Sequence, residues 1–277
     1  VIKAWALTAK EQGAAGLSHL LKIGKANTVD GQDMPSVFAM QAAHLSAHLG
    51  DDAEMRGFAD ELFNRQNLSS QILLQLASLY ARHGETAKMA QLIDRLPTGF
   101  NKKAVQLHLL CQTKSPKIAS HIAAGIIDSS LLNNQSQTGG MLNARLGLAL
   151  YLDPQINTAH FLLAQALYEM GQYQAALAKL DAIDVAGAWG QPQLLLRIDL
   201  ERKDNITGAI TLMQTAVDKD GDNALLRKEL GDLYRISDQY EKARDAYLMA
   251  LDLGLVSGEL DRSLGISYEQ LEQDQLA

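Results

Sequence analysis

Two histidines have the spacing by which a helix can bind a metal ion. His44 and His48 are four residues apart in a predicted helix, and this spacing places both imidazoles on one helix face. No Glu follows His44, as it would in the helix of a metalloprotease, and no third ligand can be identified. We therefore expect two histidines on a helix surface, with no bound metal or other cofactor.

The other nucleophiles, acids and bases form no catalytic pattern. The sequence contains no phosphate-binding glycine loop, nucleophile elbow, CxxC pair or pair of carboxylates at catalytic spacing. His83 stands before Gly84 at a predicted helix end, where a cationic side chain suits the helix dipole. Trp5 and Trp189 are expected to pack inside the protein. The sequence therefore predicts a protein that is not an enzyme.

The only cysteine, Cys111, cannot form an intrachain disulfide, and we expect it to be buried as a small apolar residue. No apolar run approaches the ~18 residues that a membrane-spanning helix needs, and no signal-like segment precedes Val1. The chain starts without Met, so a processed form is an alternative and the compartment stays open.

Charge is divided unevenly along the chain. Residues 1–138 carry 13 Lys and Arg against 11 Asp and Glu, which gives +2, and residues 139–277 carry 12 against 21, which gives −9. An acidic surface without a stripe of Lys and Arg argues against nucleic acid and against anionic lipid, because both need cations on their phosphates. The simplest alternative is a solvated acidic surface that aids solubility.

The elements that would position any binding site repeat along the chain. Leu230-Gly231-x-x-Tyr234 returns further on as Leu264-Gly265-x-x-Tyr268 (265 − 231 = 34). This displacement is the length of one helix-turn-helix repeat. Within the repeat at 224–257, Gly231 and Ala243 are small enough to let two helices touch, and the turn falls at 237–239. The low content of Pro and aromatic residues also favours an all-α fold.

Weaker copies extend the pattern toward the N-terminus. One repeat is predicted at 157–189, and Gly50 and Gly84 show the same displacement (84 − 50 = 34). We expect one solenoid over 1–277, formed by arrays at 1–111 and 141–277 with an irregular seam at 112–140. The last copy, from Leu264, is predicted to be a first helix without its partner, either as a cap or because the chain ends early.

The motif Leu230-Gly231-x-x-Tyr234, followed by Ala243, Tyr247 and Ala250, resembles the tetratricopeptide repeat family. The resemblance implies a right-handed superhelix of antiparallel helix pairs, in which the first helix of each pair lines a concave groove that binds polypeptides. The segment 146–180 also resembles exported bacterial tetratricopeptide proteins, which favours a periplasmic location over a cytoplasmic one.

The family's groove positions can be transferred to this sequence one residue at a time. They fall on Thr158, Phe161, Leu162, Gln165, Tyr168, Glu169, Leu194, Leu195, Ile198, Glu201, Arg202, Lys228, Glu229, Asp232, Arg235, Arg262, Ile266 and Glu269. In the family's carboxylate clamp, Lys228 would occupy the lysine position. Asp232 and Ser263 replace the asparagines, and an anionic Asp232 would repel a carboxylate. The resemblance therefore does not extend to a clamp for a C-terminal carboxylate.

Two functions of different kinds fit this sequence. The first is a scaffold that holds a protein or peptide partner in the groove, with Phe161, Leu195 and Tyr168 as apolar anchors. The second is a structural subunit or assembly factor of a larger cell-envelope or membrane-associated complex, which would use its outer face or the helix around Leu264 and Tyr268. The oligomeric state and the identity of the partner are left open.

Overall fold

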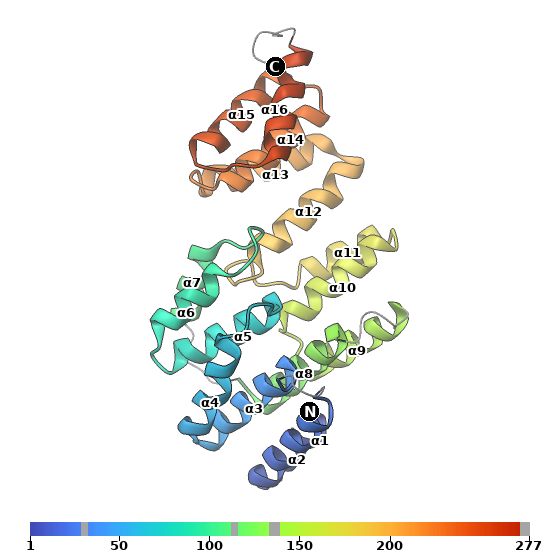
Figure 1. Cartoon of the computed structure of the whole chain (residues 1–277). Coiled ribbons are helices and arrows are strands. Elements are labelled where there is room, and N and C mark those ends of the chain that lie inside the picture. The colour runs from blue at the N-terminus through green and yellow to red at the C-terminus, as the bar shows by residue number, and fades with distance from the viewer. Residues whose placement is uncertain (29–32, 112–115, 133–138, 272–277) are drawn as a thin grey trace. The chain divides into compact units, whose positions relative to one another are not determined.

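The computed structural model describes residues 1–28, 33–111, 116–132 and 139–271. In these ranges it contains sixteen α-helices and no strand, so the predicted all-α repeat fold is confirmed (Figure 1). The chain forms two compact units, residues 1–193 and 194–277, which we call unit 1 and unit 2. The single solenoid with one seam stays a prediction, and residues 112–115 and 133–138 of that seam lie outside the described residues.

Unit 1 consists of short helices joined by tight turns. Its helices are α1 (Ile2–Thr8), α2 (Gly13–Ala26), α3 (Ser36–Leu49), α4 (Asp52–Phe63), α5 (Ser70–Arg82), α6 (Thr86–Asp94), α7 (Lys102–Cys111), α8 (Ile118–Leu132), α9 (Gly139–Leu152), α10 (Asn157–Glu169) and α11 (Tyr173–Leu180). The turns after α3 and α5 contain Gly50 and Gly84, whose φ angles of 77° and 76° favour glycine. The predicted displacement between these glycines therefore marks equivalent turns.

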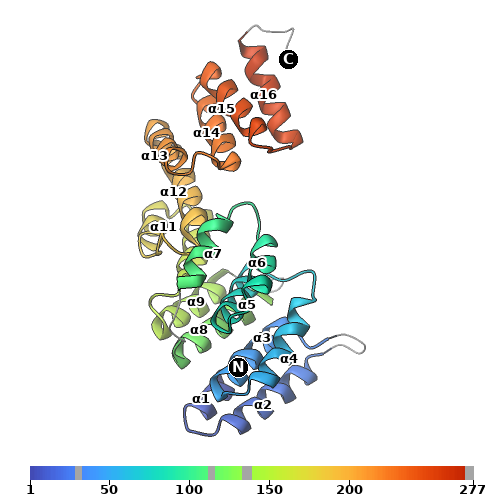
Figure 2. The same ribbon diagram turned by 90° about the vertical axis from the view of Figure 1, so that its left-hand side faces the viewer.

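The helix pairs of unit 1 pack through small residues and leucines. Figure 2 shows the antiparallel pairs α1–α2 and α3–α4. The largest apolar cluster of the unit extends from α3 to α7, and Met40, Leu76 and Leu92 are among its fully buried side chains. Burial of this apolar surface, more than the intrinsic helix propensity of short segments, stabilises such helices.

Helix α8 departs from simple stacking of neighbours. In a regular solenoid each repeat contacts only the repeats next to it, but α8 packs against α1 and α3 as well as against α9. Ile118 and Ile122 of α8 pack against an apolar cluster that includes Trp5 and Leu45. Helix α8 therefore covers faces of α1 and α3 that a regular solenoid would leave open.

Two expectations for unit 1 were wrong. His44 is buried, with 5% exposure, because α8 covers the face of α3 that carries it, whereas His48 is exposed. Cys111 is exposed at the end of α7. That helix buries Val105 and Leu109, which are four residues apart, and a residue two positions after Leu109 faces away from this side.

Unit 2 contains the best copies of the repeat. Its helices are the larger part of α12 (Gly190–Asp204), followed by α13 (Ile206–Lys219), α14 (Ala224–Ile236), α15 (Tyr240–Asp252) and α16 (Gly258–Gln270). The turn between α14 and α15 falls at 237–239, where the sequence predicts it. Gly231 of α14 faces the ring of Tyr247 on α15, and a Cβ built at Gly231 would lie 2.5 Å from Tyr247 Cε1. The glycine therefore permits the close approach of the two helices.

Gly231→Ala and Gly265→Ala are expected to have opposite effects on stability. A methyl group at Gly231 would overpack against the buried Tyr247 ring, and we expect a net loss of about 1 to 2 kcal/mol in the free energy of unfolding. A Cβ at Gly265 has no atom within 4 Å, so its alanine should be neutral or stabilising by up to about 1 kcal/mol. Urea unfolding would measure both, and equal shifts would contradict the assigned contact.

Candidate functional site: a charged groove in unit 2

A cavity of about 550 Å³ lies between α12, α13, α14 and the start of α16. We call it the Lys228 groove. Its lining residues, all in unit 2, are Leu195, Ile198, Asp199, Arg202, Met213, Lys228, Glu229, Asp232, Leu233, Arg235, Ile236 and Glu259. Apolar and charged side chains therefore meet in one concave surface, as in many ligand-binding sites.

Helix α14 supplies half of the lining residues. One of its faces is apolar and buried, and another carries charged side chains. Leu226, Leu230 and Tyr234 recur at a spacing of four residues and are buried in the core of the unit. Lys228, Asp232 and Arg235 recur at a spacing of four and three residues on another face and line the groove. The helix begins at the cap formed by Asn223, whose Oδ1 accepts a hydrogen bond of 3.3 Å from the backbone N–H of Leu226.

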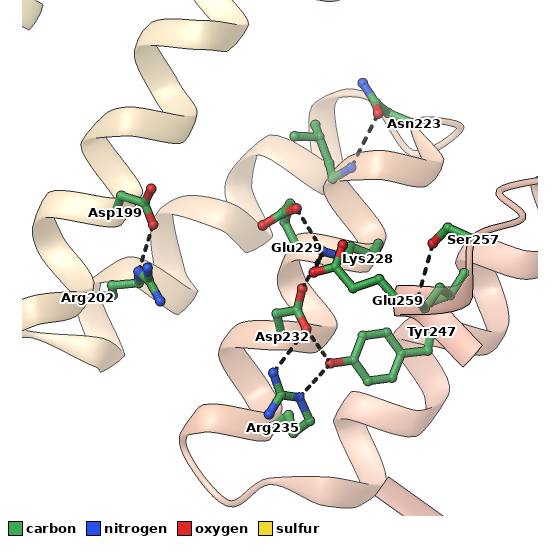
Figure 3. A network of polar contacts seen from close by, with 12 residues as sticks. Asp199, Arg202, Asn223, Lys228, Glu229, Asp232, Arg235, Tyr247, Ser257 and Glu259 are labelled. Carbon is green, nitrogen blue, oxygen red and sulfur yellow. Dashed lines mark hydrogen bonds and ion pairs between the residues drawn. The ribbon is translucent and has the colours of Figure 1, made fainter. Parts of the chain in front are cut away.

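Lys228 lies at the centre of a cluster of carboxylates. Its Nζ is 2.8 Å from Asp232 Oδ2, 3.2 Å from Glu259 Oε1 and 3.3 Å from Glu229 Oε1 (Figure 3). Burial alone would lower the pKa of Lys228, but the three carboxylates raise it above its usual value. The ammonium is therefore charged, and its three contacts are made within the protein.

Glu259 reaches this cluster from another helix. It lies in the first turn of α16, which begins after Ser257, and Ser257 Oγ accepts a hydrogen bond of 3.1 Å from the backbone N–H of Leu260. A carboxylate in the first turn also complements the helix dipole. The contact from Glu259 to Lys228 thus ties α16 to α14.

A second set of polar contacts fixes Asp232. The Tyr247 hydroxyl donates a hydrogen bond of 2.8 Å to Asp232 Oδ1, and Arg235 Nε donates one of 3.2 Å to the same hydroxyl. Arg235 Nη2 lies 3.4 Å from Asp232 Oδ1. Burial first, and then the contact with Asp232, raise the pKa of Tyr247, so this phenol stays protonated. Asp232 is therefore a structural acceptor shared by three side chains (Figure 3).

Seven predicted groove residues line the Lys228 groove. They are Leu195, Ile198, Arg202, Lys228, Glu229, Asp232 and Arg235. Arg202 forms an ion pair with Asp199, with 2.7 Å between Nε and Oδ1. Leu194 and Glu201, which come from the same helix, do not line the cavity, and Leu194 packs against the apolar cluster of unit 2.

The remaining predicted residues lie elsewhere. Thr158, Phe161, Leu162, Gln165, Tyr168 and Glu169 belong to α10 of unit 1. Thr158 is buried and donates a hydrogen bond of 2.6 Å to Gln71 Oε1, and the Phe161 ring packs 5.0 Å from that of Trp189. In unit 2, Arg262, Ile266 and Glu269 are exposed on α16 and do not line the groove.

The sequence did not identify five lining residues: Asp199, Met213, Leu233, Ile236 and Glu259. The transfer from the family used equivalent positions of first helices, whereas Met213 comes from a second helix and Glu259 from a helix start. One signal was available for Asp199, because an acidic residue three positions before Arg202 is at ion-pair spacing on a helix.

In the part of the chain that the structure describes, no group of three or more His, Cys, Asp and Glu side chains could hold a metal ion. No described helix combines the length and the apolar character needed to cross a bilayer.

Unit 2 is a repeat of antiparallel helix pairs. Its sequence also matches a family model for such repeats. Residues 198–254 match the model described as tetratricopeptide repeat, as the resemblance predicts for this segment of the chain. Repeats of this family generally serve protein–protein interaction and not catalysis. A comparison with curated proteins found no match.

Solved structures of helical repeat proteins also resemble the whole chain. The human IFIT1 dimer with PPP-AAAA is 14% identical with a TM-score of 0.41, and 98% of this chain covers 64% of that one. A tetratricopeptide repeat protein from Parabacteroides merdae is 14% identical over 96% of both chains, with a TM-score of 0.40. The chain thus spans less than two thirds of the length of the IFIT1 structures, and at these scores the resemblance does not bear on partners.

Proposed function

We propose that the protein is a non-catalytic interaction scaffold whose Lys228 groove binds a polypeptide segment with apolar and basic side chains. The observation that carries this proposal is the composition of the groove. Leu195, Ile198, Met213, Leu233 and Ile236 provide apolar surface beside charged groups. Apolar anchors in a pocket with a polar rim are the usual basis of peptide affinity.

The charge of the groove favours a basic partner. Three cations and four carboxylates line it, an excess of one negative charge (3 − 4 = −1). Residues 194–277 carry 10 Lys and Arg against 17 Asp and Glu, a balance of −7. Because Lys228 already contacts three carboxylates, it adds little attraction for an anionic partner. The field of unit 2 would therefore steer Lys and Arg toward the groove.

A peptide-display selection against the protein should enrich segments that combine apolar residues with Lys or Arg. We expect micromolar affinity. The double variant Leu195→Ala, Ile236→Ala should weaken binding about tenfold or more, because it removes two apolar contacts from the groove. Isothermal titration at low and at high salt would measure both effects, and affinity should fall as salt screens the charges.

Leu248→Ala is a matched control, since Leu248 is an exposed apolar residue of α15 that does not line the groove. It should leave peptide affinity unchanged. Equal losses in the groove variant and the control, or a selection dominated by acidic peptides, would exclude the proposed site.

A specific observation also supports the second function, a subunit of a larger assembly. Met249, Leu253 and Val256 are 49%, 40% and 85% exposed near the end of α15. Contiguous exposed apolar surface often marks a protein interface, and these three residues are close together in sequence. Native mass spectrometry of the full-length protein separates the two functions: a stable stoichiometric complex favours the assembly role, and a monomer that binds free peptide favours the scaffold.

A further inference from the structure

A second cavity, of about 570 Å³, lies in unit 1 between α3, α5, the end of α7 and the start of α8. Its polar lining is made of cationic or potentially cationic groups: His44, His48, Arg82, His83 and His121. The remaining lining residues are Ala47, Leu79, Ala81, Leu110 and Pro116, so none of the described lining residues is a carboxylate, although Asp52 Oδ1 lies 3.8 Å from His83 Nδ1. Such a lining contrasts with the acidic composition of the Lys228 groove.

Arg82 is the one arginine among the described residues that line this cavity. It is the last residue of α5 and is only partly exposed, and burial lowers the pKa of its guanidinium. Its side chain forms no hydrogen bond or ion pair with any residue that the structure describes. An unpaired, partly buried cation is unfavourable, and the planar guanidinium is suited to bind an oxyanion through two parallel hydrogen bonds.

The rings of His44 and His121 are held in place by contacts with other rings. The His121 ring stacks on Trp5 with a centroid distance of 4.6 Å and an interplanar angle of 1°, and it lies 4.6 Å from the His44 ring. Burial lowers the pKa of His121 to about 3, with a further contribution from the nearby Arg82. An anion beside Arg82 would offset the repulsion between Arg82 and a protonated His121. The charges around the cavity therefore favour a bound anion.

An adjoining cavity of about 310 Å³ shares His44, Arg82, Pro116 and His121 with the first one. Away from these shared residues its lining combines the apolar side chains of Leu74, Leu109, Ile156, Ala188 and Trp189 with polar ones, among them the carboxylate of Asp153. The two cavities therefore adjoin at Arg82 and the two histidines, and the second one adds apolar side chains to the lining. Their volumes are in the range of small-molecule sites.

We propose that unit 1 binds an organic oxyanion, a carboxylate or a phosphate monoester joined to an apolar group. Arg82 holds the anion, the rings of His44 and His121 flank it, and the apolar group lies along Leu109 and Trp189. This site is separate from the Lys228 groove, and its ligand is a small molecule. The proposal therefore does not depend on the polypeptide partner proposed for unit 2.

Phenyl phosphate and 3-phenylpropionate would test this site, with benzyl alcohol as the uncharged analogue. In an NMR titration of protein with labelled histidine at pH about 7, we expect either anion to shift the imidazole signals of His44 and His121 at millimolar concentration. The signals of His19 and His160, which do not line either cavity, should stay in place. The tighter of the two probes identifies the anion, and benzyl alcohol should bind about tenfold more weakly.

Arg82→Gln should weaken the binding of the anions about tenfold or more and leave that of benzyl alcohol nearly unchanged. The matched control is Arg56→Gln, because Arg56 is an exposed arginine of unit 1 outside the cavity. Unchanged anion binding in folded Arg82→Gln would overturn the proposal. If that variant does not fold, the wild-type titration decides: absence of shifts at His44 and His121 up to about 10 mM of both anions would overturn it.

Discussion

Asp128→Asn is expected to stabilise the protein at pH 8 and to have a much smaller effect at pH 4. Asp128 is 2% exposed, and both its carboxylate oxygens accept hydrogen bonds of 3.1 Å from Gln75 Nε2. Burial raises the pKa of Asp128 to about 7, although the hydrogen bond from Gln75 opposes this shift. The folded protein must therefore either retain a proton on Asp128 or bury a negative charge.

The sign of the effect follows from the raised pKa. Between pH about 4 and about 7 the folded state binds a proton at Asp128 that the unfolded state has released, so the contribution of Asp128 to stability falls as pH rises. The loss is about 1.4 kcal/mol per pH unit, or about 4 kcal/mol over this window. Asparagine stays neutral and avoids this loss. Urea unfolding at both pH values would measure it as the difference between variant and wild type.

Comparing the variant with the wild type also cancels the contributions of other titrating groups to the pH dependence of stability. Burial lowers the pKa of His44 and His121, so wild-type stability falls again as the pH drops below about 6.5, but the variant shares this effect. Asp94→Asn is the control for a loss of charge, since Asp94 is exposed on α6. An Asp128→Asn effect that does not change with pH would show that Asp128 is ionised in the folded protein.

The fold could be predicted from the sequence where the determining contacts are local. Gly231, Ala243 and Tyr247 all lie within a single repeat, and the contact between α14 and α15 requires their sizes. A pattern of this kind fixes both helices and the turn between them. The same is true of the turns at Gly50 and Gly84.

The packing of α8 against α1 and α3 could not be predicted in this way, because it joins residues far apart in sequence. Gln41, Gln75 and Asp128 are polar, and polar side chains in short helices normally indicate an exposed face. One signal was available. Residues 118–132 are apolar on all sides apart from a few polar residues, and a helix of that kind is usually buried.

The candidate site was predictable only in part, for a related reason. Periodicity places Lys228, Asp232 and Arg235 on one face of α14, but it does not show what lies opposite them. The three carboxylates around Lys228 come from two helices, and Glu259 belongs to the helix pair after the one that carries Lys228. The sequence could show that Asp232 disfavours a carboxylate ligand, but not that Lys228 is already paired.

Lys228→Met is expected to lower the free energy of unfolding by about 2 to 3 kcal/mol at pH 7. Breaking a buried ion pair from one side typically costs about 3 to 5 kcal/mol, and the partial exposure of Glu229 and Glu259 reduces that cost. Without the ammonium, Glu229 and Asp232 remain close to each other on successive turns of α14. Urea unfolding would measure the loss.

The pH dependence of this loss tests its cause. Burial already raises the pKa of Glu229, with a further contribution from the charge of Asp232, and Lys228 opposes both. In Lys228→Met this pKa should rise further, so protonation of Glu229 should recover part of the lost stability as the pH falls toward about 4. Glu229→Gln added to Lys228→Met should recover part of it at pH 7, because it removes one of the unpaired charges.

Lys242→Met is the control, because Lys242 is exposed on α15 and its only hydrogen bond among the described residues is to Gln239. We expect it to change stability by less than about 0.5 kcal/mol. If Lys228→Met behaved like this control, the carboxylates would not hold Lys228 in the folded protein. Lys228 would then be available to a partner's carboxylate, and the inference that the groove prefers a basic segment would fail with it.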